Sequence, residues 1–191
     1  PDPRVSGTGF EKLREANIKV DMIPNAQILA KDVVRGFISR ITKKRPFVTV
    51  KLGMSNDGKI ATKSGDSKWI TNKFLRNRGH LLRVQNDAIL VGTNTFARDN
   101  PKLNVRGTLN NLSNPLRVFL DYRLETFPSQ SVLTNISESR SLIICGENPN
   151  LKNLKIWENF GVEILKIPSS NKTVDLRKLV ELLGLRGINS L

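Results

Sequence analysis

Lys51, Arg83 and Arg106 are the side chains best suited to chemistry on a phosphorylated molecule. A guanidinium matches a phosphate through two parallel hydrogen bonds, so both arginines are candidate phosphate ligands. Lys51 stands inside an otherwise apolar run, where an ammonium needs a partner or must reach the strand end. Two plainer explanations stay open: an edge strand that turns Lys51 to solvent, and arginines that are simply solvated on a basic surface.

Polar loops between the apolar runs supply further candidates. Trp69 follows the Gly-Asp-Ser of residues 65–67 and could stack on a ligand ring or pack on the next helix. The pairs Asp57-Gly58 and Asp99-Asn100 are ordinary turn residues when taken alone. These loops follow strand ends, where open α/β sheets bind ligands. The sequence has no G-x-G-x-x-G, no Walker motif, no paired catalytic carboxylates and no metal-binding cluster.

The composition is that of a folded protein. The 191 residues are 38% hydrophobic and 25% charged, which fits one domain or one domain plus part of another. No apolar run approaches the roughly 20 residues of a membrane helix, and residues 1–10 do not resemble a secretory signal. We therefore expect a cytoplasmic protein with no membrane partner.

Cysteine and histidine are too few for a zinc site of the usual kind. Cys145 is the single cysteine and lies in an apolar, strand-like run, so we expect a buried and inert thiol. His80 is the single histidine and lies in a predicted helix, where we expect a surface or packing residue.

The net charge of +14 indicates an anionic partner. The densest basic run, Arg40–Arg45, is short and has no aromatic residues between its cations. Aromatic residues make up only 6% of the chain, so a stacking platform for nucleic acid is poorly supported. We expect a small anionic molecule and no nucleic acid.

Strands and helices alternate along most of the chain, which predicts an α/β fold with a largely parallel sheet. Strands are expected at residues 18–20, 47–52, 88–92, 116–121, 141–146 and 162–167, with a strand start at 188–191. Helices are expected at about 8–17, 26–45, 71–86, 151–160 and 176–183. The helix at 71–86 is expected to bury four apolar side chains: Phe74, Leu75, Leu81 and Leu82.

Capping residues mark the expected helix ends. Thr8 and Glu11 have the spacing of a capping box, and Thr71 and Asp175 precede two of the predicted helices. The glycines that could end the last helix are Gly184 and Gly187.

Four motifs together are far more specific than any one of them. They are V-K-L-G-M-S-N-D-G-K-I-A at 50–61, S-K-W-I-T at 67–71, A-I-L-V-G at 88–92 and D-N-P-x-L-x-V-R at 99–106. With these motifs, residues 46–191 resemble the reductase domain of the bifunctional riboflavin-biosynthesis proteins. Residues 1–45 resemble the tail of the zinc deaminase domain that precedes it, followed by a linker helix. The deaminase motifs H-A-E and P-C-x-x-C are absent, so we expect no deamination by this chain.

The resemblance implies a dihydrofolate-reductase-like fold that binds NADPH along the carboxyl ends of its strands. The implied reaction is hydride transfer to C1′ of 5-amino-6-(5-phosphoribosylamino)uracil, which gives the ribitylamino product. Family members are commonly homodimers or homotetramers.

The same resemblance assigns roles to individual residues. It implies NADPH contacts at Gly53 or Met54, Trp69, Thr95 and Asp99. It implies contacts with the phosphorylated pyrimidine substrate at Ser67, Arg83, Leu103 and Arg106, with the arginines at the phosphate. Lys51 is the implied proton donor.

Two departures from the family pattern qualify these expectations. Tyr122 stands where the family often has a small hydroxyl residue near the cofactor phosphate, which leaves the choice between NADPH and NADH open. The family's sequence also continues beyond the position of Leu191 into a strand that ends in Glu-Gly-Gly. We therefore expect a reductase domain that is incomplete at its C-terminus, with weak activity or none.

Three alternatives remain. The chain could be a stand-alone NADPH reductase of the dihydrofolate-reductase type with another substrate. It could be a basic module that binds nucleic acid, or a non-catalytic scaffold that kept only the fold.

Overall fold

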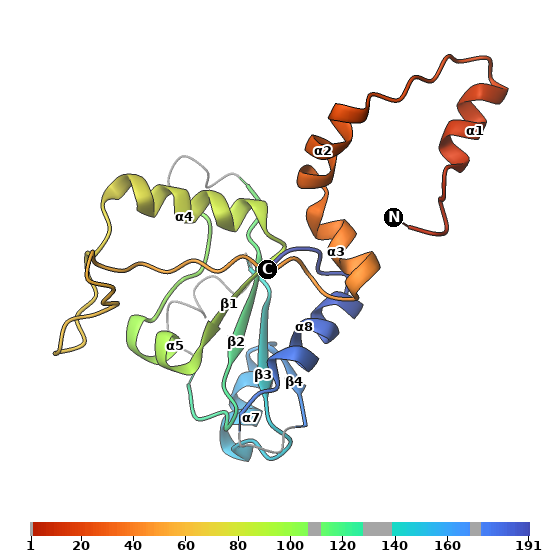
Figure 1. Cartoon of the computed structure of the whole chain (residues 1–191). Coiled ribbons are helices and arrows are strands. Elements are labelled where there is room, and N and C mark those ends of the chain that lie inside the picture. The colour runs from red at the N-terminus through yellow and green to blue at the C-terminus, as the bar shows by residue number, and fades with distance from the viewer. Residues whose placement is uncertain (1, 107–111, 128–138, 169–172) are drawn as a thin grey trace. The chain divides into compact units, whose positions relative to one another are not determined.

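The structure is a computed structural model that describes residues 2–106, 112–127, 139–168 and 173–191. The chain divides into two compact units, and Figure 1 labels their helices and strands. The first comprises Pro1–Phe47 and Val180–Ser190, and the second comprises Val48–Leu179 and Leu191. The predicted division into a deaminase tail and a reductase domain stays a prediction.

The second unit contains a four-stranded parallel sheet with the strand order β1-β2-β3-β4. The strands are β1 (Ala88–Gly92), β2 (Leu116–Leu120), β3 (Ser141–Cys145) and β4 (Glu163–Lys166). All four were predicted. The unit also contains α4 (Lys73–Gln85), α5 (Thr93–Asp99) and α7 (Leu151–Asn159), and it includes the start of α8 (Leu176–Leu185).

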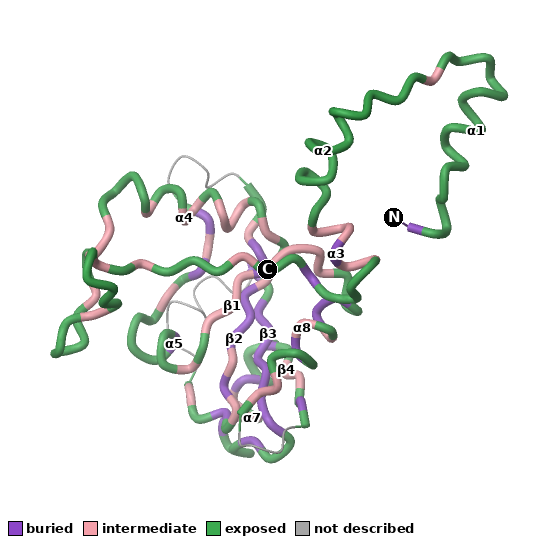
Figure 2. Tube along the Cα trace, in the orientation of Figure 1, coloured by how far each residue is buried: buried purple, intermediate pink, exposed green. Residues whose placement is uncertain are grey.

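The core of this unit lies between the sheet and the helices α5 and α7. The ring of Phe96 on α5 lies 4.6 Å from that of Phe119 on β2 and 6.0 Å from that of Trp157 on α7. Every residue of β3 is buried, so this strand is covered on both faces (Figure 2). Cys145 belongs to the same cluster, and burial raises the pKa of its thiol to about 11. The predicted burial of Cys145 is thus confirmed.

The first unit contains α1 (Thr8–Glu15), α2 (Pro24–Val33) and α3 (Arg35–Lys43). Neither α1 nor α2 buries a residue. Around α3 the chain packs closely, because Arg40 Nε donates a 2.7 Å hydrogen bond to Asn189 Oδ1 and Phe47 N donates a 2.8 Å bond to the Asn189 carbonyl. The buried Ser39 hydroxyl donates to the carbonyl of Arg45 at 2.9 Å.

Two predicted strands are absent from the described residues. Residues 18–20 form no strand, and residues 47–52 contribute only an isolated parallel bridge from Phe47 to Ser190. The next bond, from Thr49 N to the carbonyl of Leu191 at 2.7 Å, uses the last residue of the sequence. A strand needs a hydrogen-bonding neighbour, and Val50 beyond this point is 77% exposed. Lys51 therefore lies in an extended, exposed segment and not in a strand.

The predicted helix at 26–45 is wrong in detail, because the structure has two helices that meet at Val34. The backbone of Val34 (φ −102°, ψ 19°) departs from helical geometry. Two consecutive β-branched residues, Val33 and Val34, disfavour a continuous helix at this point.

The capping predictions divide into correct and incorrect ones. Asp175 does cap α8, since its Oδ1 accepts the N–H of Arg177 at 2.9 Å. Thr8 does not cap α1: Gly7 is the N-cap, and the Thr8 hydroxyl donates to the carbonyl of Val5. The N-cap of α4 is Asn72, one residue after the predicted Thr71. At the end of α8, Gly184 lies within the helix, while Gly187 follows it with φ +88°.

The predicted buried side of α4 is also wrong. Phe74 is 68% exposed, and Leu75 and Leu81 are exposed as well, while Leu82 is half-buried. The half-buried side of α4 carries Arg76, His80 and Arg83 in their place. Helix α5 was missed altogether, because its seven polar-rich residues read as a turn.

Gly184 and Gly79 offer a matched test of this packing. A Cβ added at Gly184 would lie 2.5 Å from the carbonyl oxygen of Lys44 and 2.9 Å from Arg45 Cα, both rigid backbone atoms. We expect Gly184→Ala to lower the free energy of unfolding by about 1–3 kcal/mol. A Cβ at Gly79 in α4 would meet nothing within 4 Å, so Gly79→Ala should raise it by about 0.5–1 kcal/mol. Urea unfolding followed by circular dichroism measures both; equal stabilisation by the two alanines would contradict this packing of Gly184.

Candidate functional site

The loop that follows β2 is held rigidly at the carboxyl end of the sheet. The buried carboxylate of Asp121 accepts the N–H of Thr126 at 2.8 Å and its hydroxyl at 2.6 Å. From α7, Trp157 Nε1 donates to the Thr126 carbonyl at 2.9 Å, and Asn153 Nδ2 donates to the Leu124 carbonyl at 2.8 Å. The loop therefore has a defined shape before any ligand binds.

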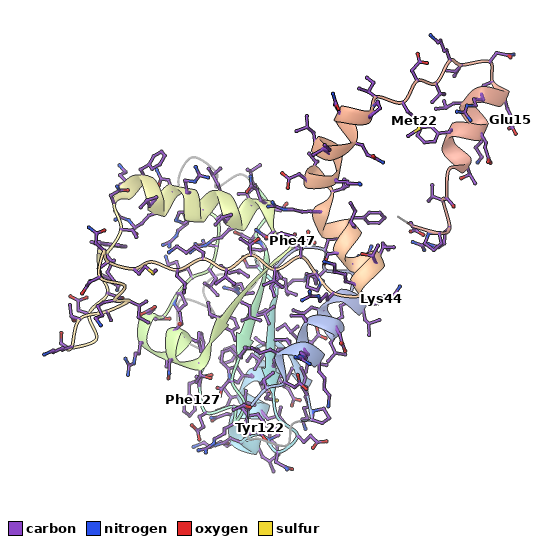
Figure 3. All side chains as sticks on the ribbon, viewed as in Figure 1. Glu15, Met22, Lys44, Phe47, Tyr122 and Phe127 are labelled. Atoms are coloured by element: carbon purple, nitrogen blue, oxygen red, sulfur yellow. The ribbon has the colours of Figure 1, made fainter. Side chains whose placement is uncertain are left out.

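Tyr122 covers the carboxyl end of β3. Gly146 N donates a 2.8 Å hydrogen bond to the Tyr122 carbonyl, and a Cβ on Gly146 would lie 2.5 Å from the Tyr122 ring. Only glycine leaves room for this ring at the position. Tyr122 lies at the lower end of the sheet in Figure 3, in the same region as Phe127.

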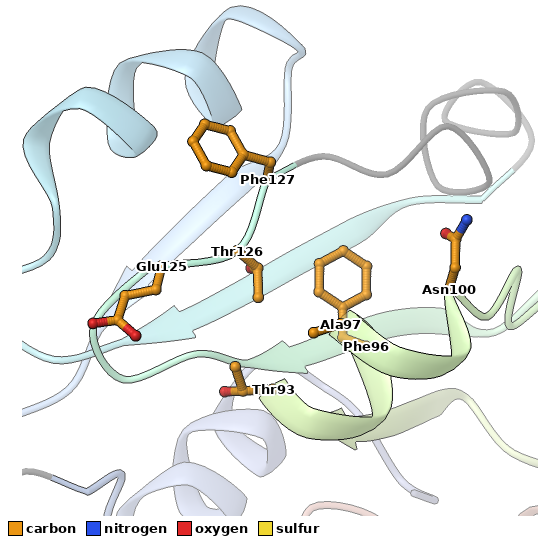
Figure 4. A pocket seen from close by; sticks show the side chains of 7 residues that line it. All are labelled: Thr93, Phe96, Ala97, Asn100, Glu125, Thr126 and Phe127. Carbon is orange, nitrogen blue, oxygen red and sulfur yellow. The ribbon is translucent and has the colours of Figure 1, made fainter. Parts of the chain in front are cut away.

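A cavity of about 500 Å³ lies between α5 and this loop (Figure 4). Its position is fixed in part by Thr93, whose hydroxyl donates to the Leu120 carbonyl at 2.6 Å. The carboxyl ends of β1 and β2 thus border a space of the size that a small molecule needs. The lining residues are Thr93, Phe96, Ala97, Asn100, Glu125, Thr126 and Phe127.

A second group of residues surrounds the start of α4. A Cβ on Gly53 would lie 3.5 Å from Lys51 Nζ and 3.6 Å from Thr71 Cγ2, so these three residues adjoin. Arg76 Nη1 donates to the Thr71 carbonyl at 2.5 Å, and its guanidinium lies 4.3 Å above the Trp69 ring. Trp69 is 73% exposed, which makes it a supported but open aromatic surface.

A third group gathers positive charge. Arg83 is half-buried, and its Nη1 donates to the Asn104 carbonyl at 2.6 Å. Burial and the nearby Arg106 lower the pKa of Arg83 to about 10. His80 Nδ1 lies 3.5 Å from Arg83 Nη1. In the part of the chain that the structure describes, neither Arg83 nor Arg106 forms an ion pair with a carboxylate. Such a cluster is suited to an anion.

The predicted site residues fall into distinct environments. The structure brings Lys51 close to Gly53, and Arg83 close to Arg106. Met54 is exposed and Ser67 is half-buried on the loop before α4. These six assignments remain predictions of function.

The other predicted contacts lie on or after α5. Thr95 and Asp99 are exposed on α5, whose neighbouring residues line the cavity, although neither of these two lines it. Leu103 is 4% exposed and packs in the core, so any ligand contact there would fall to its backbone.

Sequence reasoning missed Arg76 and His80 as members of a site, and Glu125 as a cavity residue. The spacing of Arg76, His80 and Arg83 by four and three residues places them on one helix face, a signal that was present in the sequence. The described residues contain no group of three His, Cys, Asp or Glu side chains that could hold a metal, and no helix long and apolar enough to cross a membrane.

Curated relatives are similar along nearly the whole chain. The riboflavin biosynthesis protein RibD of Aquifex aeolicus is 40% identical over 182 residues, which cover 95% of this chain and 50% of the relative. RibD of Actinobacillus pleuropneumoniae is 36% identical over 192 residues, which cover 100% of this chain and 50% of the relative. The chain therefore spans about half the length of these relatives.

Solved structures agree with the fold. A diaminohydroxyphosphoribosylaminopyrimidine deaminase/5-amino-6-(5-phosphoribosylamino)uracil reductase from Thermotoga maritima superposes with a TM-score of 0.78 at 34% identity, covering 100% of this chain and 50% of that one. RibD of Acinetobacter baumannii gives a TM-score of 0.81 at 30% identity, covering 100% and 51%. The predicted dihydrofolate-reductase-like α/β fold is thereby confirmed.

The family model of the RibD C-terminal domain matches residues 46–191, which include every predicted site residue, the four-stranded sheet and the cation cluster of α4. This chain belongs to the RibD C-terminal domain family.

Proposed function

We propose that this chain is an NADPH-dependent reductase of 5-amino-6-(5-phosphoribosylamino)uracil in riboflavin biosynthesis. The observation that carries the proposal is the half-buried Arg83 with the exposed Arg106 nearby, neither of which has a carboxylate partner among the described residues. Burial and the charge of Arg106 lower the pKa of Arg83, and a phosphate between the two guanidiniums would offset that repulsion. The substrate of this reaction carries such a phosphate.

The cofactor part of the proposal rests on two features. The cavity at the carboxyl ends of β1 and β2 lies where open α/β sheets take nucleotides, and Thr93 offers it a hydroxyl. The exposed ring of Trp69, with Arg76 on one face, offers a surface on which a planar ring can stack. Both features fit a dinucleotide, which when bound would supply the hydride for the reduction.

The chain's own residues would bind and orient the substrate and move one proton. The phosphate held by Arg83 and Arg106 fixes one end of the substrate, which lowers the entropy cost of reaching a reactive geometry. The ammonium of Lys51, beside Gly53 and Thr71, would donate a proton at the opened ribosyl group. The backbone at Gly53 leaves room for that ammonium to approach.

Assembly and location complete the proposal. The exposed apolar side chains of α4, among them Phe74 and Leu81, support a homodimer or homotetramer that would cover them. We propose that the protein is cytoplasmic and that residues 1–45 correspond to the end of a deaminase domain and its linker helix.

Titration with NADPH and with NADH tests the cofactor assignment through tryptophan fluorescence. The chain has two tryptophans: Trp157 is fully buried, whereas Trp69 is exposed and should respond to a bound ring. We expect saturable quenching that favours NADPH and is lost in Trp69→Phe. Quenching that persists unchanged in Trp69→Phe would place the ring of the cofactor elsewhere.

Replacement of Lys51 tests the catalytic assignment. We expect Lys51→Ala to reduce the rate of NADPH oxidation with 5-amino-6-(5-phosphoribosylamino)uracil by about 10²–10⁴-fold, because a positioned proton donor is lost. NADPH binding should be retained. Lys59→Ala removes an exposed lysine from the same loop and serves as the control. Equal rates in Lys51→Ala and Lys59→Ala would remove Lys51 from the mechanism.

The phosphate site has its own test. Arg83→Gln and Arg106→Gln should each weaken binding of inorganic phosphate about ten- to hundredfold, because each removes a charge-assisted hydrogen bond. Arg78→Gln removes the same charge from the exposed side of α4 and should change binding less than about twofold. Isothermal titration calorimetry compares the three; equal losses would indicate a diffuse charge effect and not a site.

A further inference from the structure

His80 is the single histidine of the chain and lies on the half-buried side of α4, one turn before Arg83. Its Nδ1 is 3.5 Å from Arg83 Nη1. Burial, and then the charges of Arg83 and Arg106, lower the pKa of its imidazole below the usual value of 6.5. His80 is therefore mostly neutral near neutral pH, and it faces the site proposed for the phosphate.

A neutral imidazole suits this place. Its unprotonated Nδ1 can accept a hydrogen bond from the Arg83 guanidinium and so restrict the orientation of that group. A charged imidazole would be repelled by Arg83 on its own helix and by Arg106 on the segment after α5. These two arginines are the charged groups that face His80 in the described part of the chain. A doubly charged anion between them would reverse the balance and favour the imidazolium.

We propose that His80 is a positioning residue of the phosphate site, which orients Arg83 while neutral and takes up one proton from solvent when a dianionic phosphate binds. The inference rests on the proposed function, because it takes the site beside Arg83 and Arg106 to hold the substrate's phosphate. The dianion would then be surrounded by three positive charges, those of Arg83, Arg106 and the protonated His80, where the free site has two.

Proton uptake makes anion binding depend on pH with a definite sign. If the bound anion raises the pKa of His80, the anion binds more tightly below that pKa than above it. A rise of one unit corresponds to about tenfold tighter binding at the acidic end. A histidine with a purely structural role in α4 would leave binding independent of its titration.

Nuclear magnetic resonance of the intact 191-residue chain tests this inference directly, because a single histidine gives a single imidazole Cε1–H signal. The probe is inorganic sulfate, which stays doubly charged across the range of about pH 5 to 8.5, whereas a phosphate monoester has its second pKa near 6. We expect saturating sulfate to raise the midpoint of the His80 titration by about one unit.

The outcomes separate this inference from the proposed function. Sulfate that binds and is lost in Arg83→Gln, with no change in the His80 midpoint, would overturn the role of His80 and leave the phosphate site intact. An absence of sulfate binding would overturn both. A midpoint that rises with bound sulfate supports the two together.

A matched pair of variants repeats the test by calorimetry. Asparagine at position 80 places an acceptor oxygen near the position of Nδ1 but cannot titrate. In His80→Asn we expect sulfate affinity at about pH 8 to stay within about twofold, and the roughly tenfold tightening at about pH 5.5 to disappear. Arg78→Gln, on the exposed side of α4, should keep the tightening. Tightening that survives in His80→Asn would assign the proton to another group.

Discussion

The hydrogen bonds that fix the loop after β2 are the constraint on which the carboxyl edge of the sheet depends. Asp121 is nearly fully buried, and a buried carboxylate is stable only when its oxygens are bonded. It obtains these bonds from Thr126, whose carbonyl in turn accepts the indole N–H of Trp157. Because Trp157 also packs against Phe96 in the core, the loop, α7 and α5 are held as one assembly. The cavity walls are therefore set by the core itself.

Helix α4 shows the opposite balance, since the basic side chains Arg76, His80 and Arg83 are half-buried while Phe74, Leu75 and Leu81 are exposed. Arg76 is compensated there by the Trp69 ring and the Thr71 carbonyl. Arg83 has the Asn104 carbonyl and the nearby His80 Nδ1 as acceptors, against the partial desolvation of its guanidinium and the repulsion of Arg106. Such an arrangement costs stability in the free protein, and the anion that we propose to bind there would offset that cost.

The parts of the fold that the sequence predicts well are those with local signals. The four strands are short runs rich in apolar residues, and such runs can be recognised in the sequence without knowledge of their neighbours. Residues 47–52 have the same pattern but form only an isolated bridge, from Phe47 to Ser190, because pairing is not a local property of the sequence. The prediction of the buried side of α4 failed for a related reason. Apolar periodicity identifies a helix, but the side that faces inward is decided by the neighbouring segments, here those that contain Trp69 and Asn104.

The spacing of Arg76 and Arg83 along α4 sets the length of the proposed site. Arg76 and Arg83 are two helical turns apart, which corresponds to about 10 Å at 1.5 Å per residue. The helix thereby sets the separation between the open ring of Trp69 and the paired guanidiniums, with His80 between them on the same face. In the proposed site, a ligand ring at Trp69 and a phosphate at the arginines would be positioned by a single rigid element and not by two independent loops. Neighbouring turns of a helix cannot shift independently. A change in the charge of His80 would therefore alter the electrostatic energy of Arg83, because the helix holds the two side chains close together.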